Sequence, residues 1–526
     1  MLNKTCQTCF RAKIRCVKSQ SSGLCDRCLR LDKPCRFAAS RRPAKKHDAG
    51  GDAVRPVAAP STGSLHSACP FGRGLLSRSH GSKLVDIFRT KLVPHFPFVV
   101  VPTDVTEERP LLHLAVLSAA SFDDVSLQRR LGTLFSDVVA KRLASGPFAT
   151  LDMLEALLVH CAWTHYQPKP RNYSQYLSLA VSIVTDLRMD RPRNPLLWSV
   201  ETDARHDNDW GPEEVRAVAG AYYLASSSSM LLQKARSFAY MAYLGTSCRN
   251  LALQSAADGD KYLPYIVEAQ RIAEGIDALT GEPASAGAAR LRTLNEEYAA
   301  LKSSVTFPLS NSPPLIVLMN MLELLMHSAP GTASFNLAEI RDSSLCPPWL
   351  LERIHAVRLM INTLVTMAPG DEYGLSNIEW ITMHCALSLA ARMDIVAASS
   401  GIGATQARRA LDMPHSLKQV LLRLESASDG TLDQGGDHDP FHQLARRVRR
   451  LEEWHLARLE RIEVPVASPS ADRLDSLDTN AAHPLEWTDP FPGQPEAQPA
   501  DWLEDYIGAG FGAFGMPGFA LEDRTR

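Results

Sequence analysis

The 526-residue sequence has no hydrophobic run long enough to cross a membrane. Its longest apolar stretch, Leu315 to Met326, is interrupted by Asn320 and Glu323, whereas a spanning helix needs about 20 apolar residues. We therefore expect no membrane segment. The first ten residues are polar and already contain two cysteines, so they do not resemble a secretory signal peptide, and we expect no disulfide-forming compartment.

Motifs of common enzyme classes are also missing. The sequence contains no GxSxG nucleophile motif, no P-loop and no HExxH zinc motif. Residues 401–403 (Gly-Ile-Gly) lack the third glycine and the preceding strand of a dinucleotide-binding loop. His160, Cys161 and His165 lie close together, but on amphipathic stretches without a second ligand pair. We interpret them as core or surface residues rather than a metal site, and we expect no enzyme activity.

A net charge of −2 hides a strong polarity along the chain. Residues 1–46 hold 13 lysines and arginines against two acidic residues, while the rest of the chain holds 43 basic and 56 acidic residues. A basic segment favours a polyanion such as nucleic acid, and an acidic remainder is repelled by it. The charge distribution therefore predicts a nucleic-acid-binding N-terminus.

What the sequence does contain is a dense group of cysteines in its first 35 residues. A CxxC pair followed, after six intervening residues, by a third cysteine occurs twice: Cys6, Cys9 and Cys16, then Cys25, Cys28 and Cys35. Tetrahedral zinc needs four ligands, so six thiolates can serve two zincs only if two cysteines bridge both metals. The alternative is a disulfide framework, which is typical of small secreted domains. The spacing favours zinc.

This spacing resembles that of the fungal Zn2Cys6 binuclear-cluster transcription factors over residues 6–35. In that family the first and fourth cysteines bridge the metals. The resemblance therefore implies two Zn²⁺ ions, one held by Cys6, Cys9, Cys16 and Cys25, the other by Cys6, Cys25, Cys28 and Cys35. It also implies a nuclear, sequence-specific regulator of RNA polymerase II transcription that binds double-stranded DNA. Such proteins often control one pathway or gene cluster, for example in secondary metabolism.

The resemblance also indicates which residues read DNA. In the family, a lysine four residues after the second cysteine enters the major groove and reads a CGG triplet, and Lys13 holds this position. A lysine that donates to guanine O6 and N7 fits the major-groove code. Arg11, Arg15 and Lys18 are expected on phosphates or neighbouring bases.

The composition changes abruptly after the last clustered cysteine. We assign residues 1–46 to the DNA-binding domain with a basic extension and residues 47–80 to a flexible linker, because Pro, Gly, Ser and Ala dominate there without an apolar period. Arg41 and Arg42 begin the basic extension. Its expected role is nuclear import or additional contacts with DNA phosphates. No heptads follow the cluster, so the protein either binds one triplet as a monomer or forms a homodimer through another surface.

Residues 81–466 are predicted to form a large, all-helical regulatory domain. Asp152 with Glu155 three residues later has the form of a helix N-cap. Residues 173–187 carry an apolar stripe at helical spacing, and Pro212 with two following acids is typical of a first helical turn. The whole chain is therefore mostly α in fold class.

Two further features of this region carry predictions. Strand signals are few, and residues 97–102, bounded by prolines, are the main one. The apolar spacing that starts at Phe441 and includes Leu451 meets His455 and Arg458, so we interpret it as a domain helix that packs on its neighbours, not as a dimer zipper.

Part of this region resembles the fungal-specific regulatory region found downstream of many Zn2Cys6 clusters. The likeness covers residues 85–260 and is a pattern of helices rather than a site. It is carried by residues 154–158, 163–166, 179–181, 186–187 and 191–192.

Residues 467–526 form an acidic, aromatic-rich tail with eleven acids against three arginines. Such a composition resembles a disordered activation segment that folds onto a coactivator or the general transcription machinery. The expected anchors are Trp487, Phe491, Trp502, Leu503 and Tyr506. An inert tail would lack these aromatics, so we predict an activator. A zinc-cluster repressor, or a zinc-dependent protein-interaction module without catalytic activity, is the alternative.

Overall fold

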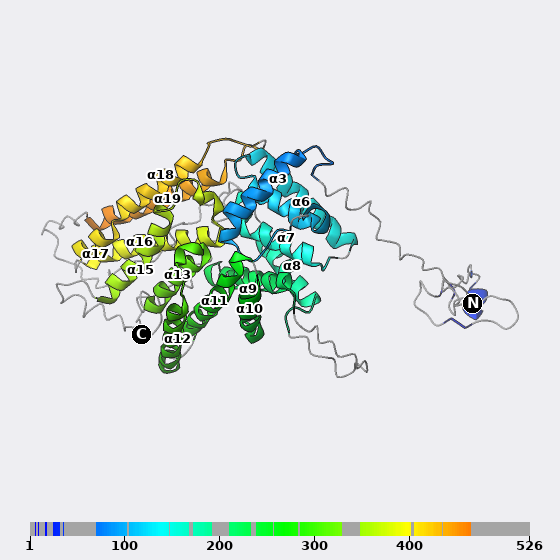
Figure 1. Cartoon of the computed structure of the whole chain (residues 1–526), viewed down its shortest axis with the longest axis horizontal. Coiled ribbons are helices and arrows are strands. Elements are labelled where there is room, and N and C mark those ends of the chain that lie inside the picture. The colour runs from blue at the N-terminus through cyan, green and yellow to red at the C-terminus, as the bar shows by residue number, and fades with distance from the viewer. Residues whose placement is uncertain are drawn as a thin grey trace, which may run out of the picture. The chain divides into compact units, whose positions relative to one another are not determined.

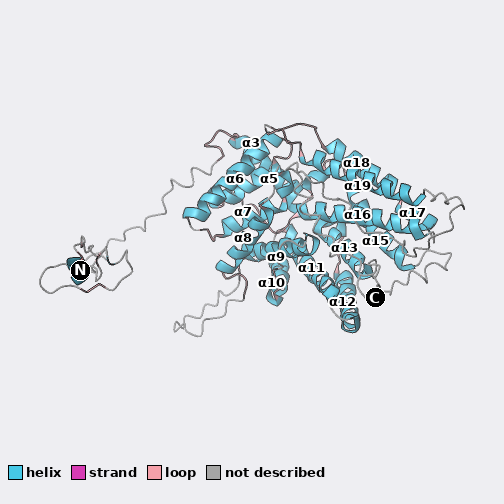
Figure 2. Ribbon diagram, turned by 180° about the vertical axis from the view of Figure 1, so that it is seen from behind, coloured by secondary structure: helices cyan, strands magenta, loops and turns pink. Residues whose placement is uncertain are grey.

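The computed structural model divides the chain into two compact units, residues 1–61 and residues 62–526. It describes residues 6, 9, 16–17, 25–31, 35, 70–102, 105–146, 148–167, 172–191, 210–232, 238–255, 257–281, 284–328, 348–400, 404–433 and 435–463. Within these ranges the chain is mostly helical and forms no strand, which confirms the mostly-α prediction (Figure 2). None of the described helices is long and apolar enough to cross a membrane.

The second unit begins with helices that gather around α5. They are α3 (Arg78–Ile87), α4 (Val105–Glu108), α5 (Pro110–Ala120), α6 (Val125–Ser145), α7 (Leu151–Ala162) and α8 (Tyr173–Asp186). Helix α5 packs against α3, α6 and α7 (Figure 1). Helix α7 packs in turn on α8 and on α9, which spans Pro212–Leu232.

The following helices continue this pairwise packing toward the C-terminus. They are α9 (Pro212–Leu232), α10 (Ala242–Gln254), α11 (Leu263–Asp277), α12 (Ala284–Ser304), α13 (Pro313–Ser328), α15 (Pro348–Val365), α16 (Asn377–Ser400), α17 (Ala404–Leu411), α18 (Met413–Ala427) and α19 (Pro440–Glu463). Helix α9 packs on α11, α11 on α13, α13 on α15, and α15 on α16. Helix α16 also packs on α17 and α19. Helix α16 also returns to contact α9 and α7.

Helices α5 and α9 are among the helices of this unit that are buried on nearly every side. Every residue of α5 after Pro110 is buried, and in α9 all residues from Val215 to Leu232 except Ser229 are buried. A helix that is buried all round must be covered by other helices on every face. The buried apolar side chains of residues 76–451, except Val125, accordingly form one continuous cluster.

Helix starts follow the proline and stripe signals of the sequence. Helix α9 begins at Pro212 with Glu213 and Glu214 in its first turn, as predicted. Helix α8 spans Tyr173–Asp186 and buries Leu177, Ala180 and Val184, which confirms the predicted stripe.

The predicted N-cap at Asp152 is wrong in an informative way. Thr150 caps α7, since its side chain accepts a hydrogen bond from the Met153 amide. The Asp152 carboxylate instead accepts from the amides of Leu111 and Leu112 at 2.9–3.2 Å. These amides lie in the first turn of α5, so Asp152 caps a neighbouring helix rather than its own.

Glu155 does not complete a capping box either. It is buried beside Arg109, with 3.9 Å between Glu155 Oε2 and Arg109 Nε. Burial raises the pKa of Glu155 to about 8, although the Arg109 charge opposes this shift.

The end of the predicted linker differs from expectation. Leu76 is buried in the core and α3 begins at Arg78, so residues 70–80, which the sequence placed in the linker, already belong to the helical unit.

Residues 97–102, the main strand signal of the sequence, pair with no strand among the described residues. Phe98 is buried there and stacks on Tyr223 with ring centroids 5.2 Å apart, because apolar β-branched and aromatic residues also fill a helical core.

Helix α19 confirms the interpretation of its apolar spacing. Phe441, Leu444, Val448 and Leu451 are buried against α16 and α18 rather than exposed as a zipper. His455 continues this buried face, with 2.9 Å from its Nε2 atom to Asp394 of α16.

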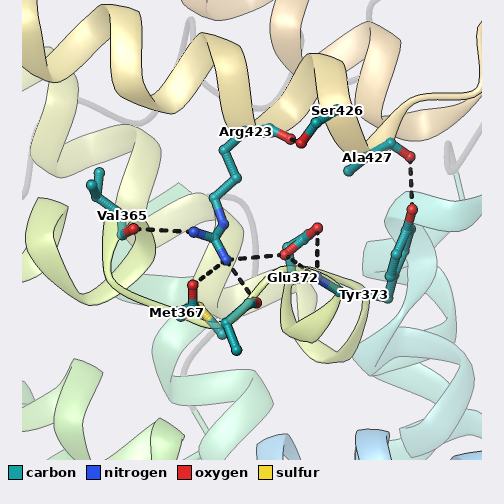
Figure 3. A network of polar contacts seen from close by, with 9 residues as sticks. Val365, Met367, Glu372, Tyr373, Arg423, Ser426 and Ala427 are labelled. Atoms are coloured by element: carbon teal, nitrogen blue, oxygen red, sulfur yellow. Dashed lines mark hydrogen bonds and ion pairs between the residues drawn. The ribbon is translucent and has the colours of Figure 1, made fainter.

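Arg423 of α18 closes the C-terminal end of α15 (Figure 3). Its guanidinium donates to the carbonyl oxygens of Val365 at 3.1 Å, Met367 at 2.5 Å and Ala368 at 2.8 Å, and it pairs with Glu372 at 3.2 Å. The last carbonyls of a helix have no intrahelical partner. Arg423, 55 or more residues downstream, therefore supplies a donor to the last carbonyl of α15 and to two carbonyls of the turn that follows.

The same loop is tied to the N-terminal helices through Tyr373. Its hydroxyl donates to the Ala427 carbonyl at 2.9 Å, and its own carbonyl accepts from the Tyr166 hydroxyl at 2.6 Å. The Tyr373 ring stacks on Phe122 with centroids 4.8 Å apart. Gly370, with φ +93°, makes the turn that brings Tyr373 here.

We predict that Arg423→Ala lowers the free energy of unfolding by about 3–5 kcal/mol, because it leaves the buried carboxylate of Glu372 without its cation and three carbonyls without this donor. Arg423→Lys should cost less, about 1–3 kcal/mol, since an ammonium cannot reproduce the planar donor set. Arg409→Ala, at an exposed position on α17, is the control and should change stability by less than about 0.5 kcal/mol. Urea unfolding of the full chain measures all three, and equal midpoints would contradict the role of Arg423.

Candidate zinc centre

The structure brings the six N-terminal cysteines together. Cys6, Cys9, Cys25 and Cys28 are buried, and Cys16 and Cys35 are partly buried against them. These cysteines form a cluster of their own, apart from the core of the helical unit. Among the described residues of this unit, only cysteine side chains are fully buried.

The two halves of the cluster repeat the same local structure. The Cys9 amide donates to Cys6 Sγ at 3.4 Å, and the Cys28 amide donates to Cys25 Sγ at 3.4 Å. The Cys6 amide donates to the third sulfur of its half, that of Cys16, at 3.4 Å. The Cys25 amide does the same to Cys35 Sγ at 3.3 Å. The duplicated spacing of the sequence is thus a duplicated structure.

Backbone contacts fix the second half and join it to the first. Cys25 is the N-cap of α2 (Asp26–Arg30), and the Asp26 amide donates to the Val17 carbonyl at 3.0 Å. Arg30, at the end of α2, is exposed.

Distances between sulfurs match those of a shared metal. Cys6 Sγ lies 3.8 Å from both Cys25 Sγ and Cys28 Sγ, and Cys9 Sγ lies 3.6 Å from Cys25 Sγ. Two thiolates on one tetrahedral zinc, each about 2.3 Å from the metal, are about 3.8 Å apart. A disulfide would need about 2.05 Å, and all nine described cysteines are free thiols.

The sulfurs form two sets of four that overlap. Within each set, all sulfurs lie within 4.8 Å of one another: Cys6, Cys9, Cys16 and Cys25, and Cys6, Cys25, Cys28 and Cys35. The overlap consists of Cys6 and Cys25. These cysteines and this grouping could hold two metal ions, and the donor set of four thiolates per site is the one that zinc prefers in structural sites.

The two shared cysteines also differ from the others in acidity. Burial would raise the pKa of Cys6, but hydrogen bonds from the Cys9 amide and neighbouring thiols lower it to about 6. The pKa of Cys25 is lowered mainly by the Cys28 amide. Burial raises the pKa of the other four, Cys9, Cys16, Cys28 and Cys35. An amide hydrogen bond to a sulfur thus favours its thiolate form, which is the form that binds metal.

The other predicted site residues lie outside the described residues. This holds for the DNA-contact residues Arg11, Lys13, Arg15, Lys18, Arg41 and Arg42. It also holds for the tail anchors Trp487, Phe491, Trp502, Leu503 and Tyr506, and for the loop 401–403.

His160, Cys161 and His165 are buried in the helical core, which confirms their interpretation as core or surface residues. Burial lowers the pKa of His160 to about 4 and that of His165 to about 3, and the His160 ring stacks on Phe135 at 4.5 Å. Neither belongs to a converging metal-ligand set among the described residues.

Sequence reasoning did not identify the amide groups that support the sulfurs. The signal was present in the CxxC spacing, because the amide three residues after a cysteine falls on that cysteine's sulfur in both halves.

Three curated fungal proteins are similar to the chain. The transcription factor himD of Aspergillus japonicus is 31% identical over 86% of this chain and 84% of that protein. The transcription factor opdL of Penicillium oxalicum is 23% identical over 89% of this chain and 92% of that protein. The transcription factor pbcR of Emericella nidulans is 27% identical over 54% of this chain and 49% of that protein. No model of a known protein family matches the chain, and no solved structure matches it.

We predict that the full chain binds two zinc ions and that single cysteine substitutions divide into two classes. Cys6→Ser or Cys25→Ser should remove both metals, because each sulfur belongs to both sets. Cys35→Ser should remove one. Cys385→Ala, in the helical core, is the control and should keep two. Elemental analysis with native mass spectrometry measures the stoichiometry, and one zinc in the unmodified chain, or equal losses in all three variants, would refute the shared-sulfur arrangement.

Proposed function

Because the chain belongs to the fungal zinc-cluster transcription factor family and is a transcription regulator, we propose that it binds DNA in a zinc-dependent and sequence-specific manner. The proposed sites are double-stranded DNA with CGG-type triplets, and the proposed output is activation of RNA polymerase II transcription in the nucleus. We include in the proposal control of one pathway or gene cluster, such as one of secondary metabolism. The observation that supports it most is the pair of four-sulfur sets that share Cys6 and Cys25.

In the N-terminal unit, residues 1–61, two zinc ions would take the place of a hydrophobic core. Within this unit, the part that the structure describes buries only cysteine side chains. A segment this short cannot stabilise itself by apolar burial. The free energy of metal binding would then be the free energy of folding. Lys13 lies between Cys9 and Cys16 in the sequence, so metal binding would fix both ends of the segment that reads DNA.

The charge of residues 1–46 supports DNA as the partner. Thirteen basic residues face two acidic ones there, and such a segment gains affinity from the release of counterions from DNA phosphates. In the alternative, an interaction module without DNA, this charge would have no polyanionic partner. Gel-shift measurements with duplexes that contain or lack CGG distinguish the two functions.

The tail supports activation as the output. Residues 467–526 alternate acids with aromatic residues. The acids would keep these anchors solvated until a coactivator groove binds them. We assign no catalytic step to the chain, in keeping with relatives that are named transcription factors.

We predict that Lys13→Ala weakens binding to CGG sites by about 1–3 kcal/mol and relaxes discrimination at the guanines, because a direct base contact is lost. The double change Arg41→Ala and Arg42→Ala is the matched comparison. It should weaken binding to all sequences alike and flatten the salt dependence by about one unit of slope per lost phosphate contact. Titrations of specific and random duplexes at several salt concentrations measure both, and equal losses on both duplexes for Lys13→Ala would contradict its role.

We predict that residues 467–526, fused to an unrelated DNA-binding domain, activate a reporter gene. Replacing Trp502 and Leu503 by alanine should reduce this activity more than the charge-removing pair Asp501→Asn and Glu504→Gln, because apolar anchors supply most of the contact area. The reverse order would mean that charge alone drives the interaction. An expressed but inactive fusion would favour repression as the output of the protein.

A further inference from the structure

A pocket of about 380 Å³ opens in the helical unit where three segments distant in sequence meet. One wall is formed by residues 73 and 75, just before α3, another by α6, and a third by residue 433 in the loop between α18 and α19. Its volume lies within the range of small-molecule sites. The DNA contacts and the proposed activation tail use none of these residues.

One end of the pocket is built around a fixed guanidinium. Arg129 is buried, donates to the carbonyls of Asp437 at 3.1 Å and His438 at 2.7 Å, and forms an ion pair with Asp433. Asp433 also accepts from the amides of Gly435 and Asp437 at 2.8 and 2.7 Å. Its hydrogen-bonding capacity is thus used within the loop, and Arg129 is held rigidly at the wall.

The positive charge of the next residue, Arg130, has no acidic partner among the described residues. Arg130 is exposed, lines the pocket, and forms no hydrogen bond or ion pair with any residue that the structure describes. Ser126 lines the pocket in the first turn of α6, whose N-terminus is already capped by the Asp124 carboxylate. The charge of Arg130 is therefore what favours an anion at this end.

The far end of the pocket has the opposite character. Asp137 is exposed and likewise has no partner among the described residues. It lies seven residues after Arg130 on α6, which is a rise of about 10.5 Å along the helix. Leu134 of α6 and Leu75 of the opposite wall supply apolar surface to the same pocket.

We propose that this pocket binds a small organic acid with an apolar middle and a hydrogen-bond donor at its far end. The carboxylate pairs with Arg130 near the first turn of α6, the apolar part contacts Leu75 and Leu134, and the donor reaches Asp137. The ligand then connects residues 73–75, which precede α3, with the loop that leads into α19. Such a ligand would be an effector of the regulator, in addition to its proposed DNA and coactivator partners.

The test is isothermal titration of the full, zinc-loaded chain with three probes that share one ring. These are 3-(4-hydroxyphenyl)propionate, 3-phenylpropionate, which lacks the donor, and tyramine, which lacks the carboxylate. The hydroxylated acid should bind one per chain and most tightly, by roughly tenfold over 3-phenylpropionate, because one hydrogen bond to a charged group distinguishes the two. Tyramine should bind most weakly.

Two exposed positions separate the contributions. Arg130→Gln should weaken both acids by roughly tenfold or more, whereas Asp137→Asn should reduce only the advantage of the hydroxylated acid. Arg292→Gln, an exposed arginine on α12, is the control and should change nothing. Circular dichroism checks that each variant keeps its helices.

Three results would overturn the proposal: no saturable binding of the acids in the millimolar range, equal weakening by Arg292→Gln, or tighter binding of tyramine than of the acids. Sodium sulfate at matched ionic strength must not displace the acids, since displacement would reduce the pocket to a general anion site. None of these measurements involves DNA, so they leave the proposed zinc-dependent DNA binding untouched.

Discussion

Sharing of sulfur between two four-cysteine sets is the constraint on which the N-terminal unit depends. Six thiols cannot complete two tetrahedra unless two of them count twice, and the structure gives this position to Cys6 and Cys25 alone. Both receive an amide hydrogen bond from the second cysteine of their own CxxC pair. Such bonds stabilise negative charge on sulfur, and the third cysteine of each half, Cys16 or Cys35, also accepts an amide hydrogen bond.

The helical unit solves the opposite problem, since it has abundant apolar surface to bury. Helices α5 and α9 are covered on every face, which leaves few places for polar groups to reach water. Two pairs of polar side chains in this interior are matched closely: Arg216 with Asp260 at 2.7 Å, and His95 with Glu379 at 2.9 Å. Breaking one member of such a pair leaves a buried charge or dipole without its partner. The interior of this unit is specified by such pairs as well as by volume.

Local signals in the sequence predicted local features well. The cysteine spacing predicted that two cysteines are shared, and the family resemblance named Cys6 and Cys25, which belong to both four-cysteine groups of the structure. Pro212 marked the start of α9, and the spacing from Phe441 identified α19 as a packed helix. These features depend on residues close together in the chain, where spacing alone determines which side chains share a face.

Contacts between distant segments were beyond the reach of these signals. Asp152 has the right chemistry for a cap, yet the helix it caps begins 42 residues earlier in the chain. Nothing in a local pattern distinguishes an aspartate that caps its own helix from one that caps a neighbour. Residues 97–102 were ambiguous for a related reason, because a short apolar run fits a strand or the interior of a helical domain equally well.

The position of Arg423 has a consequence for how the protein is made. The carbonyls of Val365 and Met367 leave the ribosome 58 and 56 residues before the side chain that binds them. At 5–20 residues per second this is an interval of roughly 3–12 s. During this time these carbonyls lack the donors that Arg423 supplies, so the end of α15 is closed only when α18 has emerged. A premature stop codon in this interval would therefore yield a chain whose earlier helices are complete in sequence but whose last turn of α15 is still open.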